Sequence, residues 1–312
     1  MKNLRDNALK MFIASIALCV SIILGSNLSA QTKVQDHQNS PEFDCIEVSD
    51  EFQVVVRPSD RYSYSVTVDD ELEPYCTNYI RNKTLFVAID RKAVPKETKK
   101  LYAGKGGKVA ILKVVVGIPA LRAVNLSGKA VMSVEGDMTS ERTGITLTEN
   151  SSLRGLDLAS GEVSIKMEGK SSASVSIDSP VINVSSTGSS SLTLRQSSRE
   201  LILEPSRSSH LNVSGEMEKV EITSAGSSET VLSGKGKLVN ITGSNSSKVN
   251  AIDFECSDAI VSLANSAVAQ EAAEDTLKVK LEGGSKLYFK GQPLFDIVRI
   301  AGSSLLPYTE MK

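Results

Sequence analysis

The sequence predicts an all-β protein whose C-terminal two-thirds forms a parallel β-helix (β-solenoid) of roughly ten rungs of about nineteen residues each. Three observations support this fold class. Glycine and asparagine recur at a nearly constant spacing, and aliphatic residues recur on both sides of them. Aromatic residues make up only 4% of the chain, with no tryptophan, although 40% of all residues are hydrophobic. A core of stacked aliphatic side chains explains all three observations.

The recurring glycine and asparagine positions predict one corner per rung in the left-handed (αL) backbone conformation, which these residues adopt at low cost. Successive spacings are 22 residues, then five of 19, then 20, 18 and 19, and Arg207 is the one member of different chemistry. The expected αL corners are Gly128, Asn150, Gly169, Gly188, Gly226, Asn245, Asn265, Gly283 and Gly302.

Two aliphatic ladders bracket these corners. Four residues before the corner lie Val124, Ile165, Val184, Leu203, Ile222, Ile241, Val261, Val279 and Val298. Four residues after it lie Ala173, Leu192, Leu211, Val249, Leu287 and Leu306. Strand alternation turns both sets to one face, which a single rung cannot bury alone, whereas coiling stacks like residues roughly 4.8 Å apart. An antiparallel sandwich stays open as an alternative, but it gives no reason for the constant spacing.

A serine ladder follows the corners. Its members are Ser151, Ser152, Ser171, Ser172, Ser189, Ser190, Ser208, Ser209, Ser227, Ser228, Ser246, Ser247, Ser266, Ser285, Ser303 and Ser304. Stacked hydroxyl groups can close the turns of neighbouring rungs. A regular hydroxyl surface that recognises a carbohydrate is the functional alternative.

The N-terminus predicts export. Residues 1–30 have the pattern of a signal peptide, with basic residues ahead of the fourteen mostly apolar residues 11–24 and small residues before a cleavage site after Ala30. An uncleaved membrane anchor is the alternative. Residues 31–42 are polar and predict a flexible leader, residues 43–117 show the period-two alternation of β-strands, and residues 118–312 hold the repeats.

Two features of the N-terminal part leave alternatives open. The lysine-rich segment 92–108 ends in a glycine-lysine run that lacks the spacing of a phosphate-binding loop, so we interpret it as a solvated, mobile loop of unassigned role. After signal cleavage three cysteines remain, Cys45, Cys76 and Cys256. Cys45 and Cys76 could pair in an oxidising compartment, or all three could be small buried hydrophobic residues.

Five segments carry a resemblance to a known family: FDCIEVSDEFQVVVRP (43–58), TLFVAI (84–89), GIPALRAVNLSGKAVMSVEG (117–136), LEGGSKLYFKGQP (281–293) and IAGSSLLPY (300–308). They resemble the bacterial head GIN domain family, whose members are described as autotransporter adhesin heads with a domain of unknown function. The similarity covers roughly residues 43–308. The resemblance implies an exported, right-handed β-helical domain, and it brings no catalytic residues that could be carried over.

The residues favour binding over catalysis. A formal net charge of −2 gives no electrostatic reason to expect nucleic acid or an anionic membrane as partner. The acidic residues do not share one repeat position. His210 lies beside Ser208 and Ser209 but has no adjacent aspartate, and no cluster predicts a metal or cofactor. The lead that we note is the irregular pair Arg207 and His210.

We therefore expect a noncatalytic, adhesin-like binding protein in the periplasm or on the surface of a Gram-negative bacterium, not integral to the membrane after signal cleavage. Its partner would be a surface glycan or an envelope protein, with end-to-end self-association as a further expectation. A structural or assembly component of the cell envelope is the first alternative. A carbohydrate-active β-helix enzyme is the second, supported by analogy of fold alone.

Overall fold

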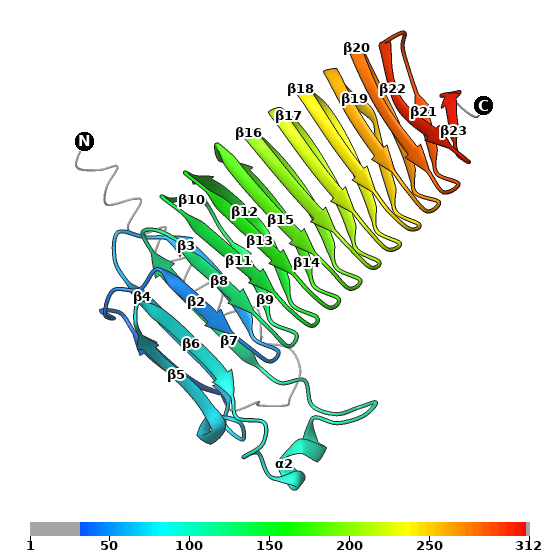
Figure 1. Cartoon of the computed structure of the whole chain (residues 1–312). Helices are drawn as coiled ribbons and strands as arrows, with labels where there is room; N and C mark the ends of the chain where they lie inside the picture. The colour runs from blue at the N-terminus through cyan, green and yellow to red at the C-terminus, as the bar shows by residue number, and fades with distance from the viewer. Residues whose placement is uncertain (1–31, 310–312) are drawn as a thin grey trace, which may run out of the picture. The chain divides into compact units, whose positions relative to one another are not determined.

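The computed structural model describes residues 32–309, and the expected signal peptide lies outside these residues. Within the described part of the chain, residues 33–309 form one compact unit. This unit is a β-solenoid, in which strands of successive rungs lie side by side (Figure 1). The fold class predicted from the repeat spacing is thereby confirmed.

The strands of the first half are β1 (Thr32–His37), β2 (Cys45–Val48), β3 (Gln53–Pro58), β4 (Ser63–Asp69), β5 (Cys76–Arg81), β6 (Thr84–Ile89), β7 (Leu112–Ile118), β8 (Ala123–Leu126), β9 (Val131–Val134), β10 (Asp137–Ser140), β11 (Thr143–Leu147), β12 (Ser152–Ser160) and β13 (Val163–Met167). Those of the second half are β14 (Ser172–Asp178), β15 (Val181–Ser186), β16 (Ser191–Pro205), β17 (His210–Ser224), β18 (Glu229–Gly243), β19 (Lys248–Leu263), β20 (Val268–Glu282), β21 (Lys286–Phe289), β22 (Leu294–Ala301) and β23 (Ser304–Pro307). The helical segments are a 3₁₀ turn (Glu73–Tyr75) and α2 (Lys96–Leu101).

Each rung consists of a strand, a corner and a second strand, and like strands stack in parallel. β13 pairs with β15, which places Ile165 beside Val184, and β14 pairs with β16, which places Val175 beside Leu194. From β16 to β20 the second strand of one rung runs directly into the first strand of the next, which produces strands of 15 or 16 residues. Most of the residues expected to face inward are buried in one continuous core.

The corners have positive φ angles along almost the whole predicted column. The values are 68° at Gly128, 75° at Gly169, 86° at Gly188, 59° at Arg207, 74° at Gly226, 60° at Asn245, 53° at Asn265, 67° at Gly283 and 60° at Gly302. In the remaining rung the prediction was wrong by one residue, because Glu149, with a φ of 60°, takes the left-handed corner and Asn150 does not. The neighbouring Asn150 offered the better turn chemistry, but the stacking of the rung selects Glu149.

The last rung also departs from the predicted ladders. Val298 and Leu306 were expected to face the core, but they are 55% and 39% exposed. Ile297 pairs with Val279 and Leu305 pairs with Leu287, and Val298 is the extra residue of a bulge in β22. The offset from the preceding rung is 18 residues at Ile297 and at Leu305, which a constant nineteen-residue spacing does not predict. Ile297 is itself 54% exposed, because no further rung of the described chain covers this one.

The solenoid begins earlier than residue 118. β2 pairs in parallel with β8, and β3 pairs in parallel with β9, so residues 45–58 already form a rung. Its corner is Asp50, with a φ of 64°. β6 and β7 pair in parallel with the other edges of β2 and β3 and so form a further rung. The division that we expected at residue 117 therefore does not separate two structural parts.

Three further strands complete the N-terminal end of the stack. β5 pairs antiparallel with β6, β4 pairs antiparallel with β7, and β1 pairs with β4. The prediction that residues 31–42 form a flexible leader was wrong for part of that segment, because Thr32–His37 forms β1. Its charged and polar side chains remain exposed, since an edge strand needs only backbone partners.

The lysine-rich segment occupies the place of a corner between β6 and β7. It contains α2 and is held to the body of the solenoid at its C-terminal side, so it is not the free loop that we expected. The Lys108 ammonium lies 2.9 Å from a carboxylate oxygen of Glu71 and 3.5 Å from one of the fully buried Asp69. Since these contacts join it to the end of β4, the insertion is part of the folded unit.

Candidate functional site

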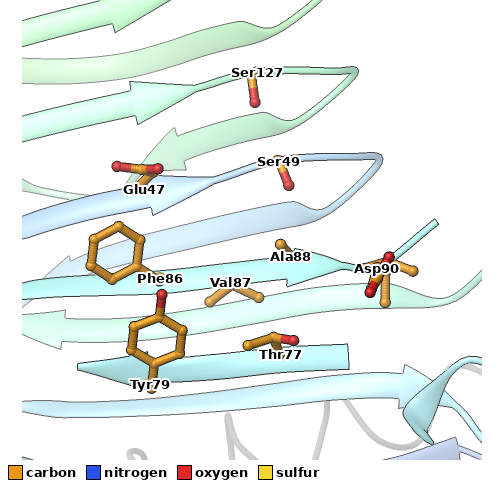
Figure 2. A pocket seen from close by; sticks show the side chains of 10 residues that line it. Glu47, Ser49, Thr77, Tyr79, Phe86, Val87, Ala88, Asp90 and Ser127 are labelled. Atoms are coloured by element: carbon orange, nitrogen blue, oxygen red, sulfur yellow. The ribbon is translucent and has the colours of Figure 1, made fainter. Parts of the chain in front are cut away.

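A shallow groove of about 300 Å³ crosses the outer face of the sheet formed by β5, β6, β2 and β8 (Figure 2). Its lining residues are Glu47, Ser49, Thr77, Tyr79, Phe86, Val87, Ala88, Ile89, Asp90 and Ser127. We call it the aromatic groove, because two rings form its floor at one end. The hairpin of β5 and β6 and two strands from separate parts of the sequence, β2 and β8, build it, so its shape depends on the solenoid and its N-terminal end.

The two rings are those of Tyr79 and Phe86, which stack with centroids 5.1 Å apart and an interplanar angle of 22°. The hairpin of β5 and β6 places them together, since Tyr79 and Phe86 are cross-strand partners. The hairpin turn is Asn82-Lys83, with φ angles of 50° and 58°, as a two-residue type I′ turn requires. Tyr79 is 44% exposed, in a chain with few aromatic residues.

Polar groups continue the groove next to the rings. Glu47 is the register partner of Phe86 on one side and of Asn125 on the other, so its exposed carboxylate follows directly after the aromatic pair. Ser49, Thr77 and Ser127 add hydroxyl groups toward the far end. The groove thus offers an apolar platform followed by hydrogen-bonding groups, within one continuous surface.

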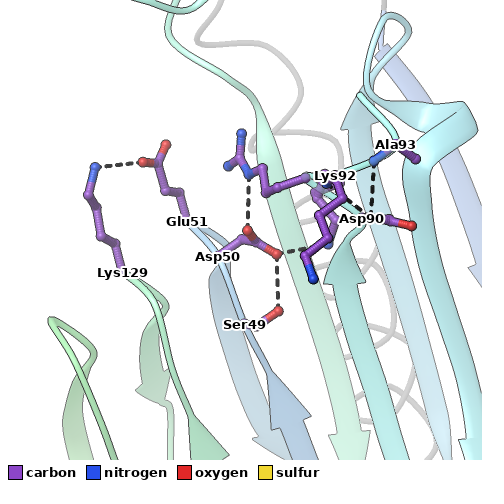
Figure 3. Close-up of polar contacts among 9 residues, drawn as sticks. Ser49, Asp50, Glu51, Asp90, Lys92, Ala93 and Lys129 are labelled. Atoms are coloured by element: carbon purple, nitrogen blue, oxygen red, sulfur yellow. Dashed lines mark hydrogen bonds and ion pairs between the residues drawn. The ribbon is translucent and has the colours of Figure 1, made fainter. Parts of the chain in front are cut away.

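The far end of the groove is fixed by the corner residue Asp50 (Figure 3). One of its carboxylate oxygens accepts hydrogen bonds from the Ile89 N–H, at 2.9 Å, and the Ser49 hydroxyl, at 3.0 Å. The other accepts one from the Arg91 guanidinium at 3.0 Å. Asp90 caps the next turn through the N–H groups of Lys92 and Ala93. These bonds hold the strand end where the chain leaves the rung for the lysine-rich insertion.

A second groove of about 470 Å³ lies on the outer face of β10, β12, β14 and β16. Asp137 and Asp157 are register partners on adjacent rungs there, and Asp178 and Arg195 lie on the two following rungs. All four side chains are exposed. Such a pair of carboxylates on adjacent rungs is the arrangement that a glycoside-cleaving enzyme would use, but such an enzyme also needs a carboxyl group that burial keeps protonated.

The serine ladder divides into a buried and an exposed column. The buried column, two residues after each corner, contains Ser151, Ser171, Ser190, Ser209, Ser228, Ser247 and Ser285. The hydroxyl of Ser209 lies 2.9 Å from the Ser206 carbonyl oxygen, and that of Ser228 lies 2.8 Å from the Ala225 carbonyl oxygen. These bonds close the corners from inside, as the structural interpretation requires. The exposed column is Ser189, Ser208, Ser227, Ser246 and Ser266.

The irregular pair Arg207 and His210 does not form a nucleophilic site. His210 is exposed, and its ring nitrogen lies 3.7 Å from a carboxylate oxygen of Glu229 on the next rung. The hydroxyl of Ser209 is buried and bonded to backbone carbonyls, so it is not available as a nucleophile beside the imidazole. Arg207 is an exposed corner residue.

Cys45 and Cys76 are free thiols at opposite ends of β6. Cys45 is the register partner of Thr84, and Cys76 is the partner of Ile89. Five residues along a strand separate these positions by roughly 17 Å, whereas a disulfide needs Cα atoms within about 7 Å. The pairing left open by the sequence is therefore excluded by the geometry of the folded chain.

Within residues 32–309, no group of three or more histidine, cysteine or acidic side chains is arranged to hold a metal ion. In the same residues no helix is both long and apolar enough to cross a bilayer.

The aromatic pair is the feature that sequence reasoning missed. A usable signal was present, because the Asn82-Lys83 turn fixes the hairpin register and thereby places Tyr79 opposite Phe86. The position of Glu47 beside Phe86 could not be predicted from a turn in this way. It depends on the parallel pairing of β2 with β6, which are separated by 39 residues of chain (84 − 45).

The chain is similar in structure to several solved bacterial proteins. A putative adhesin from Parabacteroides distasonis is 18% identical with a TM-score of 0.49, and one from Parabacteroides merdae is 15% identical with a TM-score of 0.48. A putative lipid binding protein from Parabacteroides distasonis is 15% identical with a TM-score of 0.49. Each alignment covers 90% of this chain and 98% of the other.

No curated protein matches the chain significantly. The sequence profile of the family described as "Putative auto-transporter adhesin, head GIN domain" matches residues 42–197 and 172–293, which together span most of the solenoid. The resemblance inferred from the strand and repeat motifs is confirmed, and the chain belongs to the head GIN domain family.

Proposed function

We propose that this protein is an exported, noncatalytic binding module of the cell envelope that uses the aromatic groove to hold a glycan. The observation that supports this proposal is the stacked ring pair of exposed Tyr79 and half-buried Phe86, which lies next to the carboxylate of Glu47. A pyranose ring has one face of C–H groups and a rim of hydroxyl groups. The apolar face packs against an aromatic ring, and the hydroxyl groups donate to a carboxylate or exchange hydrogen bonds with serine and threonine.

The shape of the groove supports binding of part of a longer chain. The groove is open, and it runs across four strands from the rings to Ser49 and Asp90 (Figure 2). A site of this form contacts one or two sugar units from the side and leaves both ends of a polysaccharide free. The solenoid then serves as a rigid support, because the groove is built on strands and not on loops.

The proposal that the protein is noncatalytic rests on the hydrogen bonding of the candidate nucleophile and on the solvent exposure of the candidate acids. The Ser209 hydroxyl is committed to backbone carbonyls, and the Asp137 and Asp157 carboxylates are solvent-exposed. The enzyme alternative depends on that acidic pair. Turnover of a polysaccharide that is abolished by Asp137→Asn or Asp157→Asn would establish it in place of the binding function.

A glycan array probed with the purified protein tests the binding function. We expect a restricted set of polysaccharides to be retained, and Tyr79→Ala to reduce the affinity by about tenfold or more, because one stacking ring is worth roughly 1–3 kcal/mol when a ligand packs on it. Tyr79→Phe keeps the ring and should retain most of the binding. Val231→Ala, on an exposed strand away from the groove, is the matched control. Binding that Tyr79→Ala leaves unchanged would contradict the proposed site.

Export is tested separately. Mass spectrometry of the protein from the producing cell should show a chain that begins at Gln31. Protease treatment of intact cells then distinguishes the outer surface, where the chain is cut, from the periplasm, where it is protected until the outer membrane is permeabilised. A chain that retains residues 1–30 in the cytoplasm would contradict export.

A further inference from the structure

The two ends of the solenoid differ in chemistry. At the N-terminal end the outermost strands β1 and β5 are polar, and each carries one large exposed hydrophobic residue, Val34 and Tyr79 respectively. At the C-terminal end β22 alone exposes five: Leu294 (77%), Phe295 (43%), Ile297 (54%), Val298 (55%) and Ile300 (39%). β22 forms its ladder with β20, and within residues 32–309 no strand stacks on its other edge.

An edge strand with unpaired backbone groups and exposed apolar side chains is a template for pairing with another strand. Edges that avoid pairing carry charged residues, and the polar β1 meets that description. β22 does not, because five of its eight residues are exposed and apolar. We propose that β22 is an interface, and that its occupant is β22 of a second copy of this chain, in an antiparallel, two-fold symmetric pair.

The charges of β22 support the second copy as the occupant. Asp296 pairs with Lys278 at 3.2 Å, and Arg299 pairs with Glu282 at 3.4 Å, so both lie on the outer face of the sheet although they are three residues apart. The bulge at Val298 explains this, because it adds one residue between them. Without the bulge, residues three apart would point to opposite faces.

Counted without the bulged Val298, the strand has seven positions that are centred on Ile297. An antiparallel copy with the same centre places Asp296 of each chain opposite Arg299 of the other. It also places Phe295 opposite Ile300, and Ile297 opposite its own symmetry mate. Apolar residues then meet apolar residues, and opposite charges meet twice, which is the self-complementarity that a two-fold interface requires.

Sedimentation velocity of the full purified chain over a range of concentrations tests this interface. We expect a dimer that does not grow into longer assemblies, because the polar N-terminal ends do not take part. Ile297→Asp puts two carboxylates at the centre of the pair and should raise the dimer dissociation constant by about 100-fold or more. Ile260→Asp, at an exposed isoleucine on the outer face of β19, is the matched control and should leave the dimer intact.

A charge exchange distinguishes specific pairing from general hydrophobic association. Arg299→Asp alone should weaken the dimer by about tenfold, because it faces Asp296 of the other copy. The double variant Asp296→Arg with Arg299→Asp restores opposite charges across the pair and should bind more tightly than Arg299→Asp alone, although both reversed side chains then face like charges, Lys278 and Glu282, in their own chain. A monomeric wild-type chain, concentration-dependent filaments, or equal loss of the dimer in Ile297→Asp and Ile260→Asp would each overturn the proposal. Unchanged thermal unfolding of the monomeric variants ensures that the measurement concerns association.

Discussion

The thiol of Cys256 donates a hydrogen bond to Oε1 of Glu271 at 3.2 Å, inside the solenoid core. Glu271 is fully buried, and its other carboxyl oxygen has no hydrogen-bond partner within the described chain. Its register partners are Ala251 on one rung and Phe289 on the next, so no cation faces it from either strand. Burial raises the pKa of Glu271 to about 8, although the bonds from Cys256 and the Ala272 backbone oppose the shift.

Because the folded-state pKa of Glu271 lies above its ordinary value of 4.5, the folded chain holds a proton that the unfolded chain releases. The stabilising contribution is complete below pH 4.5 and is lost as the pH rises through about 8. We expect the free energy of unfolding to fall across this window by up to about 1.4 kcal/mol per pH unit. Denaturant titrations at pH 5, 6, 7 and 8 measure it.

Glu271→Gln keeps the size of the side chain and removes the titration. This variant should have a flat stability profile between pH 5 and 8 and should exceed the wild type at pH 8 by about 1 kcal/mol or more. Glu255→Gln, at an exposed position of the preceding strand, serves as control and should keep the wild-type slope. If Glu271→Gln keeps that slope as well, another group controls the pH dependence.

The corner column predicts unequal costs for two glycines. A Cβ atom at Gly188 would lie 2.5 Å from the Gly169 carbonyl oxygen, whereas at Gly226 the nearest atoms are those of the Arg207 backbone, at 2.9 Å. The same substitution should therefore cost more at Gly188 than at Gly226: we expect Gly188→Asn to cost about 1 kcal/mol more than Gly226→Asn, although both bring a Cβ closer than ordinary contact to backbone atoms. Thermal unfolding of both variants measures the two losses of stability. Equal losses would show that close stacking of the corners does not restrict which side chains they accept.

At Arg207 the reverse substitution can be made, because this corner carries a non-glycine residue at a φ of 59°. Arg207→Gly should stabilise the protein by about 1 kcal/mol, since relief of the left-handed strain exceeds the entropy that glycine adds to the unfolded chain. Ser208→Gly, one residue later and outside the left-handed region, gains no such relief and should lower the stability slightly. A loss of stability in Arg207→Gly would mean that its side chain contributes more than the structure shows.

The rungs were predictable from sequence because stacking repeats one local chemistry many times. A left-handed corner favours glycine or asparagine, and this preference recurs in nearly every rung. A single different residue such as Arg207 therefore does not hide the repeat. The corner is ambiguous in a rung where two candidate residues are adjacent. At residues 149 and 150 the better corner former, Asn150, is not the corner, because the pairing of the flanking strands fixes the position.

The N-terminal rungs and the aromatic groove were not predictable to the same degree. The chain forms the rung of β2 and β3, leaves it to build the antiparallel end, and returns 78 residues later (123 − 45) to stack β8 on β2. No repeat spacing connects these strands. The strand β1 was missed for a related reason, since its polar composition is suited to an edge position and carries no hydrophobic alternation.

The buried serine column predicts a matched pair of substitutions. Ser209→Ala removes a hydroxyl that lies 2.9 Å from the Ser206 carbonyl oxygen and accepts a hydrogen bond from the Ser206 N–H at 3.1 Å, so we expect a loss of about 1–2 kcal/mol. The hydroxyl of Ser247 is buried without a partner in the described structure, and Ala267 occupies the equivalent position of the next rung. Ser247→Ala should therefore be neutral or slightly stabilising. Equal losses in chemical denaturation would contradict the role of these bonds in closing the corners.

The thiols of Cys45 and Cys76 should stay reduced even after export to an oxidising compartment, because they lie at opposite ends of β6. Burial is the largest cause that raises the pKa of each thiol to about 11, so little reactive thiolate exists at pH 8. We expect a thiol reagent to modify the native chain about 100-fold more slowly than free cysteine, and to titrate both groups promptly in denaturant. Intact mass under nonreducing conditions provides the second measurement. A mass lower by two hydrogens, or a denatured chain in which these thiols are no longer titratable, would show that they pair, which the strand register of the folded chain forbids.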